Sequence, residues 1–230
     1  MSGHPALEVR DLRVGYDDVD VIDGLSLAVA PGEMVALLGR NGAGKTTALA
    51  AVAGLIPIHA GTVLVDGVDV SGRSAGRRVG AGLITVPDDR GLFRSLTIAE
   101  HLRLVDGDLG EVGEWFPDLA PLGNRAAGLC SGGEQQQLAV ALALVRRPRV
   151  LLVDELSMGL APQVAETLLA RIRTLVDETR MAAVVVEQFV DSVLGVAHRG
   201  MVLADGRILT DRPAAELAAD HAALEAAYLG

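Results

Sequence analysis

The stretch Gly39-Arg40-Asn41-Gly42-Ala43-Gly44-Lys45-Thr46 decides the fold of this chain, because it fits the G-x-x-x-x-G-K-[ST] pattern of phosphate-binding loops. It follows the short apolar run 34–38 and opens a helix-like stretch, 45–54, which is the context that the motif requires. Glycines allow backbone N–H groups to turn inward, and a helix N-terminus adds its positive dipole end. The motif therefore predicts a phosphate site, whereas a glycine-rich turn with a chance lysine would not account for its context.

The lysine of this motif is unusual in its own right. Of the 20 basic residues, 19 are arginine and one is Lys45. A lysine left at random among these positions would fall here about one time in twenty. We expect Lys45 to reach the β- and γ-phosphates of a nucleotide and the Thr46 hydroxyl to bind Mg²⁺. The nucleotide-binding residues predicted around this loop are Gly39, Arg40, Asn41, Gly42, Ala43, Gly44, Lys45, Thr46 and Thr47.

Two adjacent acids follow a second apolar run. Residues 150–153 read as a buried strand that ends in Asp154 and Glu155. At a strand tip beside the phosphate loop, Asp154 would bind Mg²⁺ directly or through water. Side chains alternate along a strand, so Glu155 points elsewhere and can deprotonate an attacking water. Alone, the two acids could be a solvated turn; together with the phosphate loop they predict hydrolysis of a nucleotide.

The order of the apolar segments predicts an α/β fold. Three alternating segments near the start predict an antiparallel β-subdomain: 7–14, 25–29 and 63–70. Three continuous apolar runs predict strands buried on both faces of a parallel sheet: 34–38, 150–153 and 183–186.

The stretch 88–145 differs from the rest, because it contains helix-like patterns and no convincing strand. We interpret it as a helical lobe inserted into the core, which comprises 1–87 and 146–230. All 230 residues then form a single domain. Within the lobe, the glycine-containing stretch 106–113 is expected to be an exposed turn.

Composition predicts the make-up of the core and argues against several classes of partner. Hydrophobic residues make up 50% and aromatic residues 3%, which predicts a core of Ala, Val, Leu and Ile. A net charge of −10 argues against nucleic acid as a partner. With a single cysteine, Cys130, the chain cannot form an intrachain disulfide, which fits a reducing cytosol. We expect Cys130 to act either as a small apolar packing residue or as a redox-sensitive thiol. No signal peptide is visible and no apolar run approaches the ~18 residues of a membrane span, so any membrane role would need a partner.

A third motif, Ser131-Gly132-Gly133-Glu134, opens a helix-like stretch. Serine with glutamate three residues later predicts a capping box. A capping box does not call for the two glycines, which each lower helix propensity by ~1 kcal/mol. Their presence indicates that another group must approach this backbone closely.

The three motifs occur in the order found in the ATPases of ABC transporters, and the chain resembles that family over nearly its whole length. The resemblance implies hydrolysis of MgATP by a head-to-tail dimer. Each ATP would lie between the phosphate loop of one subunit and Ser131, Gly132 and Gly133 of the other. The resemblance also implies two integral-membrane permease subunits, with this chain on the cytoplasmic, inner face of the cell membrane.

Three further positions follow from the resemblance. Tyr16 resembles the aromatic residue that stacks on adenine, although a packing aromatic at a strand edge is the alternative. Asp88 stands where the family has a glutamine that contacts Mg²⁺ and the lytic water. Gln188 stands where the family has a histidine that contacts the γ-phosphate. The residues expected at the reaction are thus Glu155, Lys45, Gln188 and Asp88, and those at the metal Thr46, Asp154 and Asp88.

These departures look like the LivF-type ATP-binding subunit of branched-chain amino-acid importers. That resemblance implies a heterodimer with a LivG-type subunit or a homodimer, and a solute-binding protein that acts indirectly from outside the cytoplasm. Importers of urea or short amides are close cousins and stay open as alternatives. A soluble ABC ATPase without a transport function, and a degenerate module that binds ATP without turnover, are also left open.

Overall fold

The structure, a computed structural model, describes residues 4–17, 19–220 and 224. Its strands are β1 (Leu7–Tyr16), β2 (Val19–Val29), β3 (Met34–Leu38), β4 (Ala60–Val65), β5 (Val68–Asp69), β6 (Leu83–Val86), β7 (Val150–Asp154), β8 (Ala182–Val186), β9 (Arg199–Ala204) and β10 (Arg207–Pro213). Its helices are α1 (Lys45–Ala53), α2 (Ala75–Gly80), α3 (Ile98–Arg103), α4 (Leu109–Trp115), α5 (Gly132–Val145), α6 (Pro162–Thr179), α7 (Val190–Leu194) and α8 (Ala214–Ala219), with short 3-10 helices η1 (Pro117–Leu122) and η2 (Ala127–Leu129). Within these ranges no helix is both long and apolar enough to cross a bilayer.

The N-terminal part forms an antiparallel sheet in the strand order β2-β1-β4-β5. Between β4 and β5, Asp66 and Gly67 both have positive φ, at 48° and 76°, while Val65 pairs with Val68. Two central residues of positive φ give a tight hairpin whose twist matches that of the flanking strands. The predicted antiparallel β-subdomain is therefore present in the described residues.

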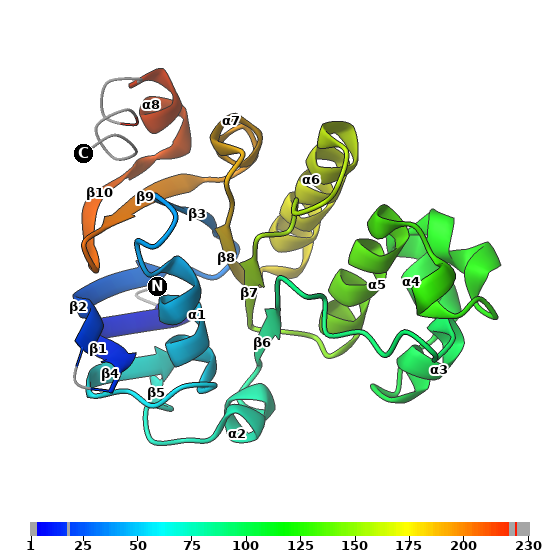
Figure 1. Ribbon diagram of the computed structural model, residues 1–230, viewed down its shortest axis with the longest axis horizontal. Helices are drawn as coiled ribbons and strands as arrows, with labels where there is room; N and C mark the ends of the chain where they lie inside the picture. The colour runs from blue at the N-terminus through cyan, green and yellow to red at the C-terminus, as the bar shows by residue number, and fades with distance from the viewer. Residues whose placement is uncertain (1–3, 18, 221–223, 225–230) are drawn as a thin grey trace.

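A second sheet has the order β10-β9-β3-β8-β7-β6, in which β9, β3, β8, β7 and β6 run parallel and β10 pairs antiparallel with β9. Every residue of β3, β7 and β8 is buried, as the continuous apolar runs predict. Alternate side chains of these strands belong to two hydrophobic clusters, one shared with α1 and the antiparallel sheet and the other with α5, α6 and α7. In Figure 1, α1 and the antiparallel sheet lie to the left of β7, and α5 and α6 lie to its right.

The arrangement of β3, β8 and β7 as parallel neighbours positions the site. Parallel strands present their carboxyl ends at one edge of a sheet, and ligands of open α/β sheets bind outside that edge. The phosphate loop follows β3, Glu155 follows β7, and Gln188 lies just beyond β8. The three segments that the sequence singles out therefore meet at this edge.

The helices α3, α4 and α5 form the part of the molecule farthest from the antiparallel sheet (Figure 1). The expectation of an exposed turn over 106–113 was wrong for its second half, because α4 begins at Leu109. Asp108 caps this helix by accepting a hydrogen bond from the Gly110 N–H at 3.2 Å, and Val112 is fully buried. Burial of the apolar face overrides the low helix propensity of the glycines.

Packing is continuous between this helical part and the central sheet. Leu138 and Val140 of α5 belong to the same hydrophobic cluster as Leu151 and Val153 of β7. The division of the chain into 88–145 and the remaining core stays a prediction.

Candidate functional site

The carboxyl edge of the central sheet holds a cavity of about 260 Å³. Three groups of side chains that the sequence singled out converge on it from different strands. The residues that line it are Val21, Asn41, Gly42, Gly44, Lys45, Thr46, Thr47, Glu155 and Gln188.

The phosphate loop needs glycine at two positions, because each combines a positive φ with a contact too close for a Cβ atom. Gly44 has φ +97°, and a Cβ there would lie 2.7 Å from Cδ1 of Ile22. Gly39 has φ +150°, and a Cβ there would lie 2.2 Å from the carbonyl oxygen of Leu203. Gly44 is also the N-cap of α1 and offers no side-chain cap, so the N–H groups of the first turn stay available to an anion.

Lys45 is buried at the start of α1, and its ammonium donates hydrogen bonds to the carbonyl oxygens of Gly39 at 2.7 Å and Arg40 at 2.9 Å. These bonds fold the lysine back onto the loop and fix the loop's curvature. Burial lowers the pKa of Lys45, and the nearby carboxylates of Glu155 and Asp154 oppose that shift. A positive charge held at the mouth of a helix N-terminus suits a polyphosphate.

The side chain of Asp154 is almost completely buried at the tip of β7. Burial raises the pKa of its carboxyl, while the Thr46 hydroxyl donates a hydrogen bond to it. Its Oδ1 atom is buried and has no hydrogen-bond partner among the described residues. A buried carboxylate oxygen with no partner, next to a threonine hydroxyl, fits one side of an octahedral Mg²⁺ shell.

The set of oxygen ligands is small. The described residues contain no cluster of three or more His, Cys, Asp or Glu able to hold a metal alone. Mg²⁺ that reaches a protein with a nucleotide typically takes one or two protein oxygens and fills its other positions with phosphate oxygens and waters. The residues present therefore fit a metal that is shared with the nucleotide.

Glu155 lies one residue beyond Asp154 and lines the cavity, as strand alternation predicts. Its backbone has φ +45°, an uncommon conformation for a non-glycine residue that costs ~1–3 kcal/mol. Its N–H continues the ladder by donating to the carbonyl of Val186 at 3.0 Å. Its Oε1 accepts a hydrogen bond from Nε2 of Gln188 at 2.9 Å. The strained backbone and the glutamine together aim a carboxylate into the cavity.

The Ser-Gly-Gly-Glu motif lies outside this cavity. The capping box is present, because Ser131 Oγ accepts from the Glu134 N–H at 3.2 Å and Glu134 Oε2 accepts from the Ser131 N–H at 2.7 Å. A Cβ at Gly133 would lie 2.9 Å from Cγ1 of Val164, so contact within the chain accounts for that glycine. A Cβ at Gly132 would meet nothing within 3.4 Å, so only an approach from outside would demand glycine there.

Comparison with known proteins decides the family. Residues 22–157 match the model of the ABC transporter family, which is more than half of the 230 residues. The chain belongs to the ABC transporter family. The predicted family, fold class and ATP-hydrolysing activity of this ABC transporter ATPase are thereby confirmed.

Individual relatives agree with this assignment. The chain is 31% identical to a probable branched-chain amino acid transport ATP-binding protein, LivF, of Archaeoglobus fulgidus, over 92% of this chain and 93% of the relative. It is 34% identical to the high-affinity branched-chain amino acid transport ATP-binding protein BraG of Pseudomonas aeruginosa, over 94% and 95%. Among solved structures, the ADP conformation of an ATP-binding cassette of an ABC transporter aligns with a TM-score of 0.84 at 20% identity, covering 96% and 97% of the two chains.

Two expected site residues of this ABC ATPase lie at the margin of the cavity. Asp88 does not line it, but its charge helps to raise the pKa of Asp154, after burial and the charge of Glu155. Tyr16 ends β1 and is 57% exposed, outside the cavity lining. Val21 of β2, the strand paired with β1, does line the cavity, so an exposed ring at Tyr16 lies on the strand pair that borders it.

Two buried charged residues outside the cavity lining support the site and were not among the predicted site residues. Glu187 is fully buried and accepts hydrogen bonds from the Ser157 hydroxyl and from the N–H groups of Ser157 at 2.9 Å and Gln188 at 3.2 Å. Arg78 is buried beneath α1 and donates from Nη1 to the carbonyls of Ala51 and Val52, both at 2.7 Å. Glu187 thus ties the loop after Glu155 to Gln188, and Arg78 neutralises the negative end of the phosphate-loop helix.

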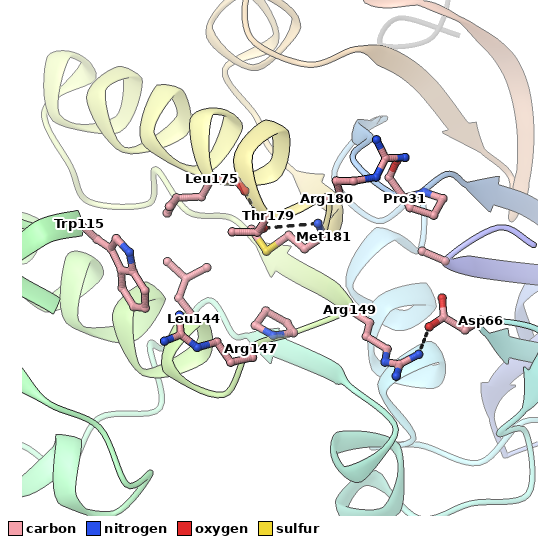
Figure 2. A pocket seen from close by; sticks show the side chains of 12 residues that line it. Pro31, Asp66, Trp115, Leu144, Arg147, Arg149, Leu175, Thr179, Arg180 and Met181 are labelled. Atoms are coloured by element: carbon pink, nitrogen blue, oxygen red, sulfur yellow. Dashed lines mark hydrogen bonds and ion pairs between the residues drawn. The ribbon is translucent and has the colours of Figure 1, made fainter. Parts of the chain in front are cut away.

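A larger cavity, of about 510 Å³, lies at the opposite edge of the sheet, where Arg149 and Met181 precede β7 and β8 (Figure 2). Its arginines are engaged within the chain. Arg149 pairs with Asp66, and Arg147 pairs with Glu111 while lying 5.5 Å from the centre of the Trp115 ring. The third arginine, Arg180, donates to the carbonyl of Pro31 at 3.5 Å. The lining also lacks a phosphate loop, so we place the nucleotide in the smaller cavity.

Proposed function

We propose that this ABC ATPase binds MgATP between two ATP-binding subunits and hydrolyses it to power import of branched-chain amino acids through two permease subunits. One observation carries the catalytic part: Lys45, Thr46, Glu155 and Gln188, which come from three separate strand ends, line one cavity. The similarity to LivF of Archaeoglobus fulgidus and BraG of Pseudomonas aeruginosa, both named as branched-chain amino acid transport proteins, supports the choice of solute. The location proposed is the cytoplasmic face of the membrane, held there by the permeases.

Separate residues would bind the phosphates, hold the metal and accept the proton of the attacking water. Lys45 and the N–H groups of the phosphate loop hold the β- and γ-phosphates. Thr46 and Asp154, with Asp88 close by, would hold Mg²⁺, which offsets the negative charge of the phosphates. Glu155 accepts a proton from the attacking water, and Gln188 both holds Glu155 Oε1 and offers its amide to the γ-phosphate.

The dimer is proposed because the signature residues do not reach the cavity of their own chain. Ser131, Gly132 and Gly133 lie at the N-terminus of α5, outside the lining of the phosphate cavity. In a head-to-tail pair they would contact the γ-phosphate held by the other subunit, and Tyr16 would stack on its adenine. Either a second copy or a LivG-type subunit could serve as that partner.

Uptake by whole cells tests the transport role. In cells that lack this chain, plasmid-borne wild type should restore uptake of labelled leucine and Glu155→Gln should not. Restoration of urea or acetamide uptake instead would move the protein to the short-amide importers. Failure to restore any uptake, combined with failure to co-purify with two permeases, would favour a soluble ABC ATPase.

Gln188 should give this enzyme an unusual pH profile. Its amide has no titratable proton, whereas a histidine there would titrate near pH ~6.5. The profile of wild-type kcat should therefore lack an inflection between pH 6 and 7 that depends on residue 188, and Gln188→His should create one. Because Gln188→Ala removes a donor to Glu155 and to phosphate, we expect a loss of roughly tenfold or more. Identical profiles and rates for all three proteins would remove Gln188 from the reaction.

Asp154→Asn should separate stability from activity. Burial and the negative charges of Glu155 and Asp88 disfavour the ionised carboxyl of Asp154, whereas the isosteric amide of asparagine carries no charge. We expect Asp154→Asn to abolish Mg²⁺-dependent turnover and yet raise the melting temperature of the nucleotide-free protein at pH 7–8 by ~2–4 °C. Burial raises the pKa of this carboxyl, so the ionised form is the destabilising one and the gain should shrink as acid protonates the wild type. A lower melting temperature at neutral pH would contradict this account.

A further inference from the structure

The turn that follows Asp88 ends in an arginine with an unusual backbone. Arg90 has φ +69°, and its N–H donates to the carbonyl of Pro87 at 3.0 Å, which closes the turn. Asp89 braces the turn by accepting from the Gly91 N–H at 3.0 Å. A positive φ at a non-glycine residue costs ~1–3 kcal/mol and persists where surrounding contacts over-determine it.

Those contacts come from the guanidinium of Arg90, which bridges two other segments of the site. Its Nε donates to Oε1 of Gln136 at 2.8 Å and its Nη1 to Oε1 of Gln135 at 2.7 Å, both on the first turns of α5. Its Nη2 lies 3.4 Å from the carbonyl oxygen of Met158, in the loop that follows Glu155. All three acceptors are neutral: two side-chain amide oxygens and one backbone carbonyl oxygen.

Gln135 links Arg90 to the segment that precedes the signature motif. Its Nε2 donates to the carbonyls of Ala127 and Cys130, both at 3.0 Å, in the segment that leads directly into Ser131. The Nη2 atom of Arg90 also lies 3.7 Å from the Cβ position of Gly132. One side chain therefore joins the turn beside Asp88, the loop after Glu155 and the start of the signature helix.

We propose that Arg90 is a positioning residue that couples the nucleotide site of its own subunit to the orientation of Ser131–Gly133. This proposal rests on the proposed function, in which those three residues act on the nucleotide held by the partner subunit. A nucleotide in the cavity would shift the turn beside Asp88, and the arginine fork would carry that shift to α5. Lysine cannot replace it, because an ammonium does not present the planar fork that holds three acceptors in fixed directions.

The single cysteine of the chain reports on this coupling. Cys130 is 9% exposed, and its carbonyl is one of the two acceptors of Gln135. The rate at which its thiol reacts with 5,5′-dithiobis(2-nitrobenzoate) therefore measures how tightly the segment before the signature is held. The protein should be kept dilute enough to remain monomeric by light scattering, so that a partner subunit does not shield the thiol.

Four proteins are compared: wild type, Arg90→Ala, Arg90→Lys and Arg77→Ala, the last being an exposed arginine on α2. In wild type, MgATP should change the labelling rate by about fivefold or more, a typical size for coupling between two sites. Arg90→Ala and Arg90→Lys should bind MgATP within about twofold of wild type but lose this response, and their kcat should fall with little change in KM. Arg77→Ala should behave as wild type.

The outcomes separate a failure of the proposed function from a failure of the role of Arg90. A wild type that does not bind MgATP would overturn the proposed function itself. A wild type that binds MgATP without a labelling response, or an Arg90→Ala protein that keeps the full response, would overturn the role of Arg90 alone. If Arg90→Ala does not fold, Gln135→Met removes the relay and leaves Arg90 in place; it should lose the same response, and an intact response there would also refute the proposal.

Discussion

Replacing Lys45 by alanine is expected to weaken MgATP binding by about 30- to 5,000-fold, because truncating one partner of a buried, hydrogen-bonded charge pair costs ~2–5 kcal/mol. Lys45 is the one lysine of the chain, and the cavity also holds Glu155, whose charge repels phosphate. Removing the ammonium leaves these repulsions unopposed. Isothermal titration with MgATP measures the change in affinity directly.

A second effect of the same substitution acts in the same direction. The ammonium of Lys45 holds the carbonyls of Gly39 and Arg40, which define the curve of the empty loop. Without it, the loop N–H groups lose part of their preorganisation toward an anion. Unfolding must be excluded as the cause, so circular dichroism spectra should match wild type. Arg77→Ala serves as the control for loss of a positive charge, and unchanged affinity in Lys45→Ala would refute the assignment of the phosphate loop.

The local features of the fold could be predicted from the sequence, because they depend on neighbours in the chain. The apolar runs that became β3, β7 and β8, the glycines of the phosphate loop and the capping box at Ser131 all fall in this class. The start of helix α4 was missed, since its glycines at 110 and 113 indicate a turn while its stability comes from burial of Val112 against distant residues. Periodicity over seven residues is too short to reveal that burial.

The contacts that organise the site could not be predicted, because they join residues 30 to 68 positions apart. Glu187 meets Ser157 and Arg90 meets Met158 only after three strands have been placed side by side. A weak signal existed for Glu187, an acid directly after the fully apolar run 182–186, where a charge is expected to need partners. Nothing in the sequence marks Arg90 among 19 arginines.

Glu155→Gln should keep MgATP binding and lower kcat by about 100- to 10,000-fold, the range that a positioned general base contributes. The amide cannot accept the proton of the attacking water at neutral pH. Its oxygen can still accept the hydrogen bond that Gln188 Nε2 donates to Oε1 at 2.9 Å, so the local structure should survive. The backbone strain at φ +45° is much the same for glutamine as for glutamate.

Loss of hydrolysis has a structural consequence for the proposed dimer. Wild type would release its partner after cleavage of ATP, whereas Glu155→Gln should remain closed around the intact nucleotide. Removing one negative charge from the cavity also weakens the repulsion of the γ-phosphate, which favours the closed pair. Size-exclusion chromatography with MgATP should therefore detect a dimer in the variant, formed with itself or with a second ATP-binding subunit, that ADP does not support.

The control for this substitution is Glu178→Gln, which removes the same charge from an exposed position on α6 and should leave kcat unchanged.

If Glu155→Gln hydrolyses ATP at a rate near that of wild type, the base is another residue. Asp88 is then the next candidate, because it is the other acid whose charge reaches Asp154. Asp88→Asn would then carry the large loss of kcat, and the double variant would fall no further than Asp88→Asn alone. If Glu155 is the base, the loss belongs to Glu155→Gln, and Asp88→Asn retains measurable turnover because a carboxylate still lies within the cavity to accept the proton.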